Sequence, residues 1–260
     1  MRADGEPSEV LIVSTRGAPR ARHRQRTRSR PVEVGAGAEP VPLTRVTVVT
    51  TEDLGSTERA ASWLEQVAAD AEAAESFASS ALRLVNRALN AHATAAQDPY
   101  VHELSIPRAA AVRLGYGEGE QVADGQWSEA RELVRGEPRR RRTEALQPQE
   151  RVAAVLGGHD RVEPSETVVL RARLDLDQGR PREAALQLEA GLPALIAELS
   201  AAEAPRREDV EALRGRETEV RRLARAAREG ELDPNAETAI AHVVALCERA
   251  LRRRRFSSSA

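Results

Sequence analysis

The densest group of acid–base side chains lies between residues 98 and 103. Asp98, His102 and Glu103 stand there beside Tyr100. Two carboxylates and a histidine in so short a span are typical of a general acid–base pair or of a weak metal site. No second histidine follows at ligand spacing, and no nucleophile motif accompanies the group. We therefore interpret these side chains as loop and capping groups, and we expect no catalytic residue, no metal and no cofactor.

A glycine-rich loop at 115–120 is the second candidate for chemistry. Such a loop binds phosphate when its backbone amides face the anion without competing negative charge. Here Glu118 and Glu120 lie inside the loop, and no Lys-Ser or Lys-Thr pair follows it. The sequence therefore excludes a P-loop and argues against a dinucleotide site.

Runs of arginine are the third candidate. The chain has no lysine, so all 39 basic residues are arginine, which indicates the codon usage of a GC-rich bacterial genome. Arginine runs bind nucleic-acid phosphates through electrostatics that do not depend on base sequence. No aromatic residue interleaves the first run, so base stacking is not expected. The residues that would contact nucleic acid are Arg22, Arg24, Arg26, Arg28, Arg139, Arg140, Arg141, Arg142, Arg252 and Arg253.

Residues 1–43 lack periodicity and are rich in Arg, Gly, Pro and Glu, which predicts disorder. Three interpretations of this segment stay open. It is an extension from a misassigned start, with the true start near Val46 or Val48; or it is a solvated tail; or it is an arm that binds nucleic acid. For the same reason, the sequence leaves open whether residues 1–45 belong to the native protein.

Composition favours helices packed closely on helices. Apolar residues make up 41% of the 260-residue chain, but aromatic residues make up only 2% and alanine supplies much of the remainder. Alanine buries little area, so the core must come from close backbone approach. Strands favour β-branched and aromatic residues. The sequence therefore predicts a mainly α-helical fold.

The single cysteine and the lengths of the apolar runs indicate the cellular compartment. The single Cys247 excludes an internal disulfide and any multi-cysteine metal site, and its place on an apolar helical stripe predicts a buried thiol. No apolar run approaches the ~20 residues that a bilayer-spanning helix needs. The apolar run near residue 11 is too short for the core of a signal peptide. We expect a cytoplasmic protein with no membrane partner.

Residues 56–97 predict one long helix, with Ser56 placed to cap it and Pro99 as the first breaker. Small and apolar side chains alternate four and three residues apart along it, which is a heptad seam typical of a coiled coil. A helix ~60 Å long at 1.5 Å per residue needs a partner. We expect a homodimer or a complex with another protein through a seam that runs from Ala60 to His92 and contains Leu64, Val67, Ala71, Ala74, Ala78, Ala81 and Val85.

The rest of the region 44–135 is predicted to hold a small irregular or β segment. Residues 45–51 are a β-prone run, and 109–114 is a candidate for either a second short strand or a short helix. Gly125 is expected to open a helix that runs to about Val134. The basic segment 136–147, with Pro138 and four successive arginines, is expected to be a linker.

Residues 148–252 predict a helical array centred on an αα-hairpin at 168–199. Gly179 and Pro181 mark its turn. Flanking helices are expected at 149–156, at 208–229 and from Pro234 onward, with residues 253–260 frayed. The predicted inward-facing residues are Leu170, Ala172 and Leu174; then Ala184, Leu188, Gly191 and Leu195; then Val210, Leu213, Val220 and Leu223; and last Ala236, Ile240, Val243, Cys247 and Ala250.

The hairpin resembles a single tetratricopeptide-type unit over about 30 residues. Gly179, Glu183, Ala184, Leu188 and Leu192 stand where that family has its turn glycine, Glu-Ala pair, bulky residue and closing leucine. Arg171 and Asp175 depart from the family pattern, and no neighbouring repeats are visible. The resemblance implies binding of a peptide or protein. The sequence thus predicts a non-enzymatic interaction or scaffold protein, with nucleic-acid binding as the alternative.

Overall fold

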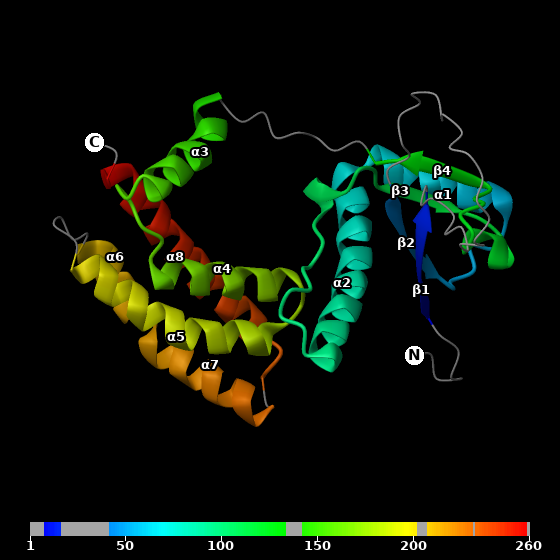
Figure 1. The fold of residues 1–260 in the computed structure, drawn as a ribbon. Coiled ribbons are helices and arrows are strands. Elements are labelled where there is room, and N and C mark those ends of the chain that lie inside the picture. The colour runs from blue at the N-terminus through cyan, green and yellow to red at the C-terminus, as the bar shows by residue number, and fades with distance from the viewer. Residues whose placement is uncertain (1–7, 17–41, 134–141, 202–206, 231, 259–260) are drawn as a thin grey trace, which may run out of the picture. The chain divides into compact units, whose positions relative to one another are not determined.

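The computed structural model describes residues 8–16, 42–133, 142–201, 207–230 and 232–258. The described chain is mainly helical with two small two-stranded sheets, as expected (Figure 1). It divides into two compact units between Arg135 and Gly136, where the basic linker is predicted to begin. In the described part, no helix has both the length and the apolar character needed to cross a membrane.

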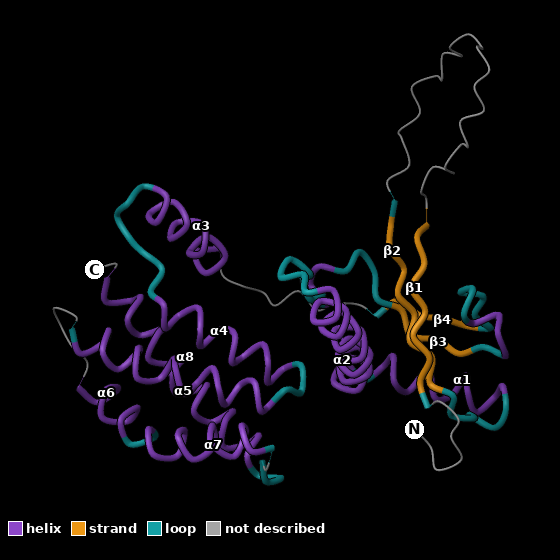
Figure 2. Tube along the Cα trace, turned by 60° about the horizontal axis from the view of Figure 1, so that its bottom comes forward, coloured by secondary structure: helices purple, strands orange, loops and turns teal. Residues whose placement is uncertain are grey.

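The N-terminal unit begins with a hairpin that the sequence analysis missed. β1 (Glu9–Arg16) pairs antiparallel with β2 (Leu43–Thr50), side by side in Figure 2. β2 confirms the strand predicted at 45–51. β1 shows that the prediction of disorder is wrong for residues 9–16, because its apolar run finds a partner strand. The interpretation of this segment as an extension from a misassigned start stays a prediction.

Two helices replace the long helix predicted at 56–97. α1 (Thr57–Ala69) ends and α2 (Ala71–Ala96) begins at Asp70, which has an extended backbone with φ −102° and ψ 106°. The Asp70 carboxylate accepts hydrogen bonds from the N–H groups of Glu72 and Ala73 at 3.0 and 3.2 Å, which caps α2. Figure 1 shows the two helices running in different directions. The prediction of one continuous helix is therefore wrong, and the residues of the apolar seam are divided between α1 and α2.

A second small sheet follows α2. η1 (Ile106–Arg108) leads to β3 (Arg113–Tyr116), and η2 (Gly119–Val122) leads to β4 (Glu129–Glu132), which pairs antiparallel with β3. The strand predicted at 109–114 overlaps β3, but the helix predicted from Gly125 is wrong. A Cβ on Gly115 would lie 2.5 Å from the carbonyl oxygen of Glu129, so glycine permits the close approach of these strands.

The C-terminal unit contains the predicted hairpin. α4 (Pro164–Asp177) and α5 (Pro181–Ser200) lie side by side and are joined by a turn in which Gly179 has φ +68°. The inward face predicted for α5 is confirmed. The face predicted for α4 is wrong for Leu170 and Leu174, which are exposed. The buried positions of α4 are Ser165, Glu166, Val169, Ala172 and Leu176.

The remaining helices complete this unit with three changes from expectation. α3 (Arg142–Leu156) begins inside the predicted linker and contains Pro148 in its interior, where we expected a helix start. The helix predicted at 208–229 is two helices, α6 (Arg207–Arg214) and α7 (Glu217–Glu229). α8 (Ala236–Ser258) extends into the tail predicted to be frayed.

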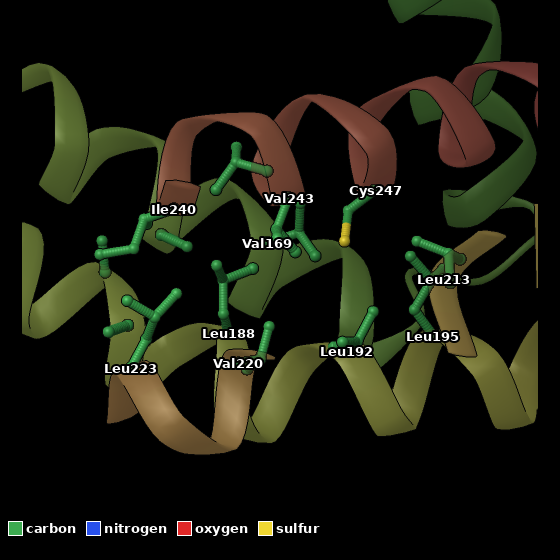
Figure 3. Close-up of a cluster of buried hydrophobic side chains, with 14 of the residues drawn as sticks. Val169, Leu188, Leu192, Leu195, Leu213, Val220, Leu223, Ile240, Val243 and Cys247 are labelled. Atoms are coloured by element: carbon green, nitrogen blue, oxygen red, sulfur yellow. The ribbon is translucent and has the colours of Figure 1, made fainter. Parts of the chain in front are cut away.

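One apolar cluster forms the core of the C-terminal unit. Side chains from α4, α5, α6, α7 and α8 meet in it (Figure 3). The predicted inward stripes of the last three helices are confirmed, because all their members are buried. Cys247 points into this cluster, and burial raises the pKa of its thiol to about 12. The predicted buried thiol is therefore confirmed.

Candidate interaction surfaces

The predicted seam is largely used inside the N-terminal unit. Leu64, Val67, Ala74 and Val85 are buried, and Ala78 and Ala81 are half-buried. α1 packs against α2, β3 and β4, while α2 packs against β2 and η1. Ala71 and His92 are exposed. As a surface for a partner, the seam stays a prediction, but its large side chains already contact their own chain.

Asn86 holds the loop after α2 in place, and the sequence analysis missed it. Its side chain is fully buried, and its amide exchanges two hydrogen bonds with the backbone of Leu104, at 2.8 and 3.0 Å. A buried amide must be paired in this way because unpaired polar groups are costly in an apolar interior. An asparagine beside Val85 on the apolar face of a helix was the available signal.

The C-terminal arginine run is occupied within its own unit. Arg252 lies 3.8 Å from Glu248, and Arg253 lies 2.7 Å from Asp209. Arg254, whose side chain is 17% exposed, pairs with both Glu166 and Glu198. Of the other predicted contacts with nucleic acid, Arg22, Arg24, Arg26, Arg28, Arg139, Arg140 and Arg141 lie outside the described residues, as does the side chain of Arg142.

Arg254 belongs to a buried ionic network that joins four helices. Glu166 on α4 is only 2% exposed. It accepts a hydrogen bond from Arg151 of α3 and forms an ion pair with Arg254 of α8, each at 2.7 Å. Glu198 of α5 pairs with Arg254 at 3.3 Å and accepts hydrogen bonds from the backbone N–H and hydroxyl of Ser165. Two arginines thus neutralise two carboxylates that the core shields from water.

The electrostatics of the network favour its ionised form. Burial raises the pKa of Glu166, but hydrogen bonds from Arg151 and Arg254 outweigh burial and hold that pKa below its ordinary value. Arg151 also donates to Asp160 at 3.0 Å, and this bond lowers the pKa of Asp160. These are shifts of a structural ion-pair network, in which every charge faces an opposite charge.

The acid–base group at 98–103 has the geometry of a turn. The Asp98 carboxylate accepts a hydrogen bond from the backbone N–H of Tyr100 at 2.9 Å, which is a local capping contact. Tyr100 and His102 are exposed. In the described ranges, no three histidine, cysteine, aspartate or glutamate residues are arranged to hold a metal ion.

An exposed leucine pair on α4 is a feature that packing within the described chain leaves unexplained. Leu170 and Leu174 are 59% and 43% exposed and lie one helical turn apart. The opposite face of α4 is buried against α5 and α8. We name Leu170 and Leu174 the α4 leucine pair. Their spacing matches a buried stripe, which is why the sequence predicts them in the core.

No family model, curated protein or solved structure matches this chain. The tetratricopeptide resemblance therefore stays a prediction that rests on the turn chemistry of the α4–α5 hairpin.

Proposed function

We propose that this protein is a non-enzymatic, cytoplasmic interaction protein that binds a protein partner through its C-terminal helical unit. The observation that carries the proposal is the α4 leucine pair. A single apolar side chain on a protein surface is common and needs no explanation. Two large apolar side chains side by side on a helix form a contact surface. Because Leu170 and Leu174 are 59% and 43% exposed, a complex that covers them gains roughly half the value of a fully buried leucine, about 1 kcal/mol each.

The hairpin supports the same proposal. Its turn resembles the tetratricopeptide type, and in α4 the buried face is complete without Leu170 and Leu174. The core thus does not need these leucines for stability, and their removal is expected to leave the fold intact. Gly191 aids the hairpin, because a Cβ there would lie 3.0 Å from Val168, so the two helices approach closely.

The experiment compares two charged variants of the full chain. Leu170→Glu combined with Leu174→Glu places carboxylates on the proposed surface, while Leu186→Glu changes a leucine on α5 that is 40% exposed. Co-purification from the native host and sedimentation are measured for each. We expect a partner, or a second copy, to be retained by wild type and by the α5 variant and lost by the α4 variant. Identical partners and identical sedimentation for all three proteins would contradict the proposal.

Nucleic-acid binding is the second candidate, and the β1–β2 hairpin favours it. The run from Arg22 to Arg28 lies in the connection between two paired strands, so both ends of the connection are held by a ladder. The C-terminal run is less favourable because its arginines form ion pairs. Replacement of the four arginines of the first run by glutamine should reduce both RNA affinity and its dependence on salt. An unchanged salt dependence would exclude this run as the contact.

A further inference from the structure

The strand register gathers three polar side chains on one face of the β1–β2 hairpin. Ser14 lies directly opposite Arg45, and Arg16 follows Ser14 by two residues. Opposite residues in an antiparallel pair project to the same face, as do residues two apart on one strand. Ser14, Arg16 and Arg45 therefore share a face at the end of the hairpin where the connection 17–42 leaves.

Both arginines donate to a single neutral acceptor. Nη2 of Arg16 and Nη2 of Arg45 lie 2.9 and 2.8 Å from the backbone carbonyl oxygen of Asp124. One shared oxygen places the two guanidinium charges side by side. Among the described residues neither of them forms an ion pair, whereas Arg113 and Arg131 of the same unit pair with carboxylates. Among the residues that the structure describes, no carboxylate pairs with either cation to offset their mutual repulsion.

Hydrogen bonding at this place is incomplete within the described part of the chain. Nε of Arg45 and Oγ of Ser14 are shielded from solvent, and neither has a hydrogen-bond partner among the described residues. Buried polar atoms are nearly always paired, and leaving one unpaired is unfavourable. Nε of Arg45 can only donate and the hydroxyl of Ser14 can donate as well as accept, so one acceptor group is able to satisfy both atoms.

Gly125 shapes the surface on which Arg45 rests. It has φ +76°, and a Cβ at this position would lie 2.1 Å from Nη1 of Arg45. Glycine therefore serves two purposes, since it adopts the left-handed backbone and leaves room for the guanidinium group against the Asp124–Gly125 turn.

We propose that Ser14, Arg16 and Arg45 form a binding site for a phosphate group. A phosphate carries the missing negative charge and presents several acceptor oxygens, which guanidinium groups bind in pairs. It replaces the Asp124 carbonyl as the acceptor for both arginines. As their side chains turn from that carbonyl, the phosphate supplies oxygens to Nε of Arg45 and Oγ of Ser14, which are covered in the unbound protein. Arg16 is exposed and Arg45 half-buried, so the anion reaches them from solvent. This site is independent of the α4 leucine pair.

The test is calorimetric titration of the full chain with inorganic phosphate, at an ionic strength held constant with chloride. We expect Arg16→Gln and Arg45→Gln each to weaken phosphate binding about tenfold or more, as the loss of a charge-assisted hydrogen bond predicts. Arg113→Gln is the matched control, because Arg113 is an exposed strand arginine that already has a carboxylate partner. If Arg45→Gln fails to fold, the exposed Arg16 decides alone. Absent phosphate binding, or equal affinity in Arg16→Gln and Arg113→Gln, would overturn the proposal.

A second arm identifies the source of the phosphate. A short single-stranded RNA is titrated against the phosphate-saturated protein. Competition that disappears in Arg16→Gln assigns the site to a nucleic-acid phosphodiester. Absence of competition, with phosphate binding intact, assigns the site to free phosphate or to a small phosphorylated molecule. Either result upholds the site itself.

Discussion

The N-terminal unit buries mainly small side chains such as Ala60, Ala74 and Val85, with Leu64 as its largest buried aliphatic residue, whereas the C-terminal unit joins leucines and valines of five helices in one cluster. The first unit compensates with side chains that bond to backbone groups, as Asn86 does with Leu104 and Arg45 with Asp124. The second places its polar side chains in an ion-pair network instead.

The difference shows that two units of one alanine-rich chain are stabilised in different ways. The free energy gained by apolar burial is proportional to the area buried. A unit built on alanine therefore gains less stability from its core and depends more on directed hydrogen bonds. We therefore expect the C-terminal unit to be the more stable of the two. Natural probes separate them, because Trp63 and Trp127 both lie in the N-terminal unit and Cys247 lies in the C-terminal unit.

The largest effect is expected from the C-terminal core. Leu192→Ala removes a fully buried side chain and should lower the free energy of unfolding by about 2–5 kcal/mol. Thiol labelling of Cys247 in denaturant should shift to lower concentrations, while tryptophan fluorescence should not. Leu170→Ala, at an exposed position, is the control and should change stability by about 0.5 kcal/mol or less. A joint shift of both probes would show that the units unfold together.

Removal of one arginine tests the ionic network. Arg254→Ala leaves buried Glu166 with Arg151 as its remaining arginine and should cost about 2–3 kcal/mol. Arg252→Ala removes an exposed arginine 3.8 Å from its partner and should cost about 0.5 kcal/mol or less. Chemical unfolding monitored by Cys247 labelling compares them. Equal losses would mean that the network contributes no more than a surface pair.

Acid should weaken the C-terminal unit through Glu166. Its pKa in the folded protein is below the ordinary value of 4.5, so its ion pairs stabilise the fold above that pH. This contribution is lost as pH falls through the lowered pKa, because the folded state must then protonate the carboxylate. The difference in melting temperature between wild type and Glu166→Gln should therefore shrink from pH 7 towards pH 3. A constant difference over that range would contradict the assignment.

The smallest effect is expected at the helix break of the N-terminal unit. Asp70→Ala removes the cap of α2 and should cost about 1 kcal/mol, while Asp70→Asn retains an N-cap acceptor and should cost less. Urea unfolding followed by tryptophan fluorescence measures both, with Glu75→Ala at an exposed site of α2 as control. If Asp70→Ala matches Glu75→Ala, the break depends on packing and not on the cap.

Local patterns were sufficient where a helix had one uninterrupted apolar stripe. The stripes of α5 and α8 and the turn at Gly179 followed from spacing and capping preferences, because these depend on residues a few positions apart. The same logic failed on α4, where two stripes compete. Leu170 and Leu174 lie on one stripe, and Glu166 lies on the other, which is the buried one.

Strand pairing also lay beyond local patterns. β1 and β2 are separated by 26 residues, and β4 has the sequence Glu-Ala-Arg-Glu, which favours a helix. Whether such a segment forms a strand depends on a partner strand, because a strand is stabilised by hydrogen bonds to its neighbour. The candidate phosphate site depends on this pairing, so no motif along the chain could indicate it.

The sequence by itself determined a mainly helical chain, the α4–α5 hairpin, the apolar faces of the last helices and a buried thiol, because each depends on composition or on side chains within two turns of a helix. The tertiary structure decided which residues of α4 face inward and which carboxylates the described arginines of the C-terminal run contact. Glu166 is tolerated in the core because Arg254, distant in the chain, reaches it with an opposite charge. Burial of a charge is decided by its partner, and only the folded chain brings the two together.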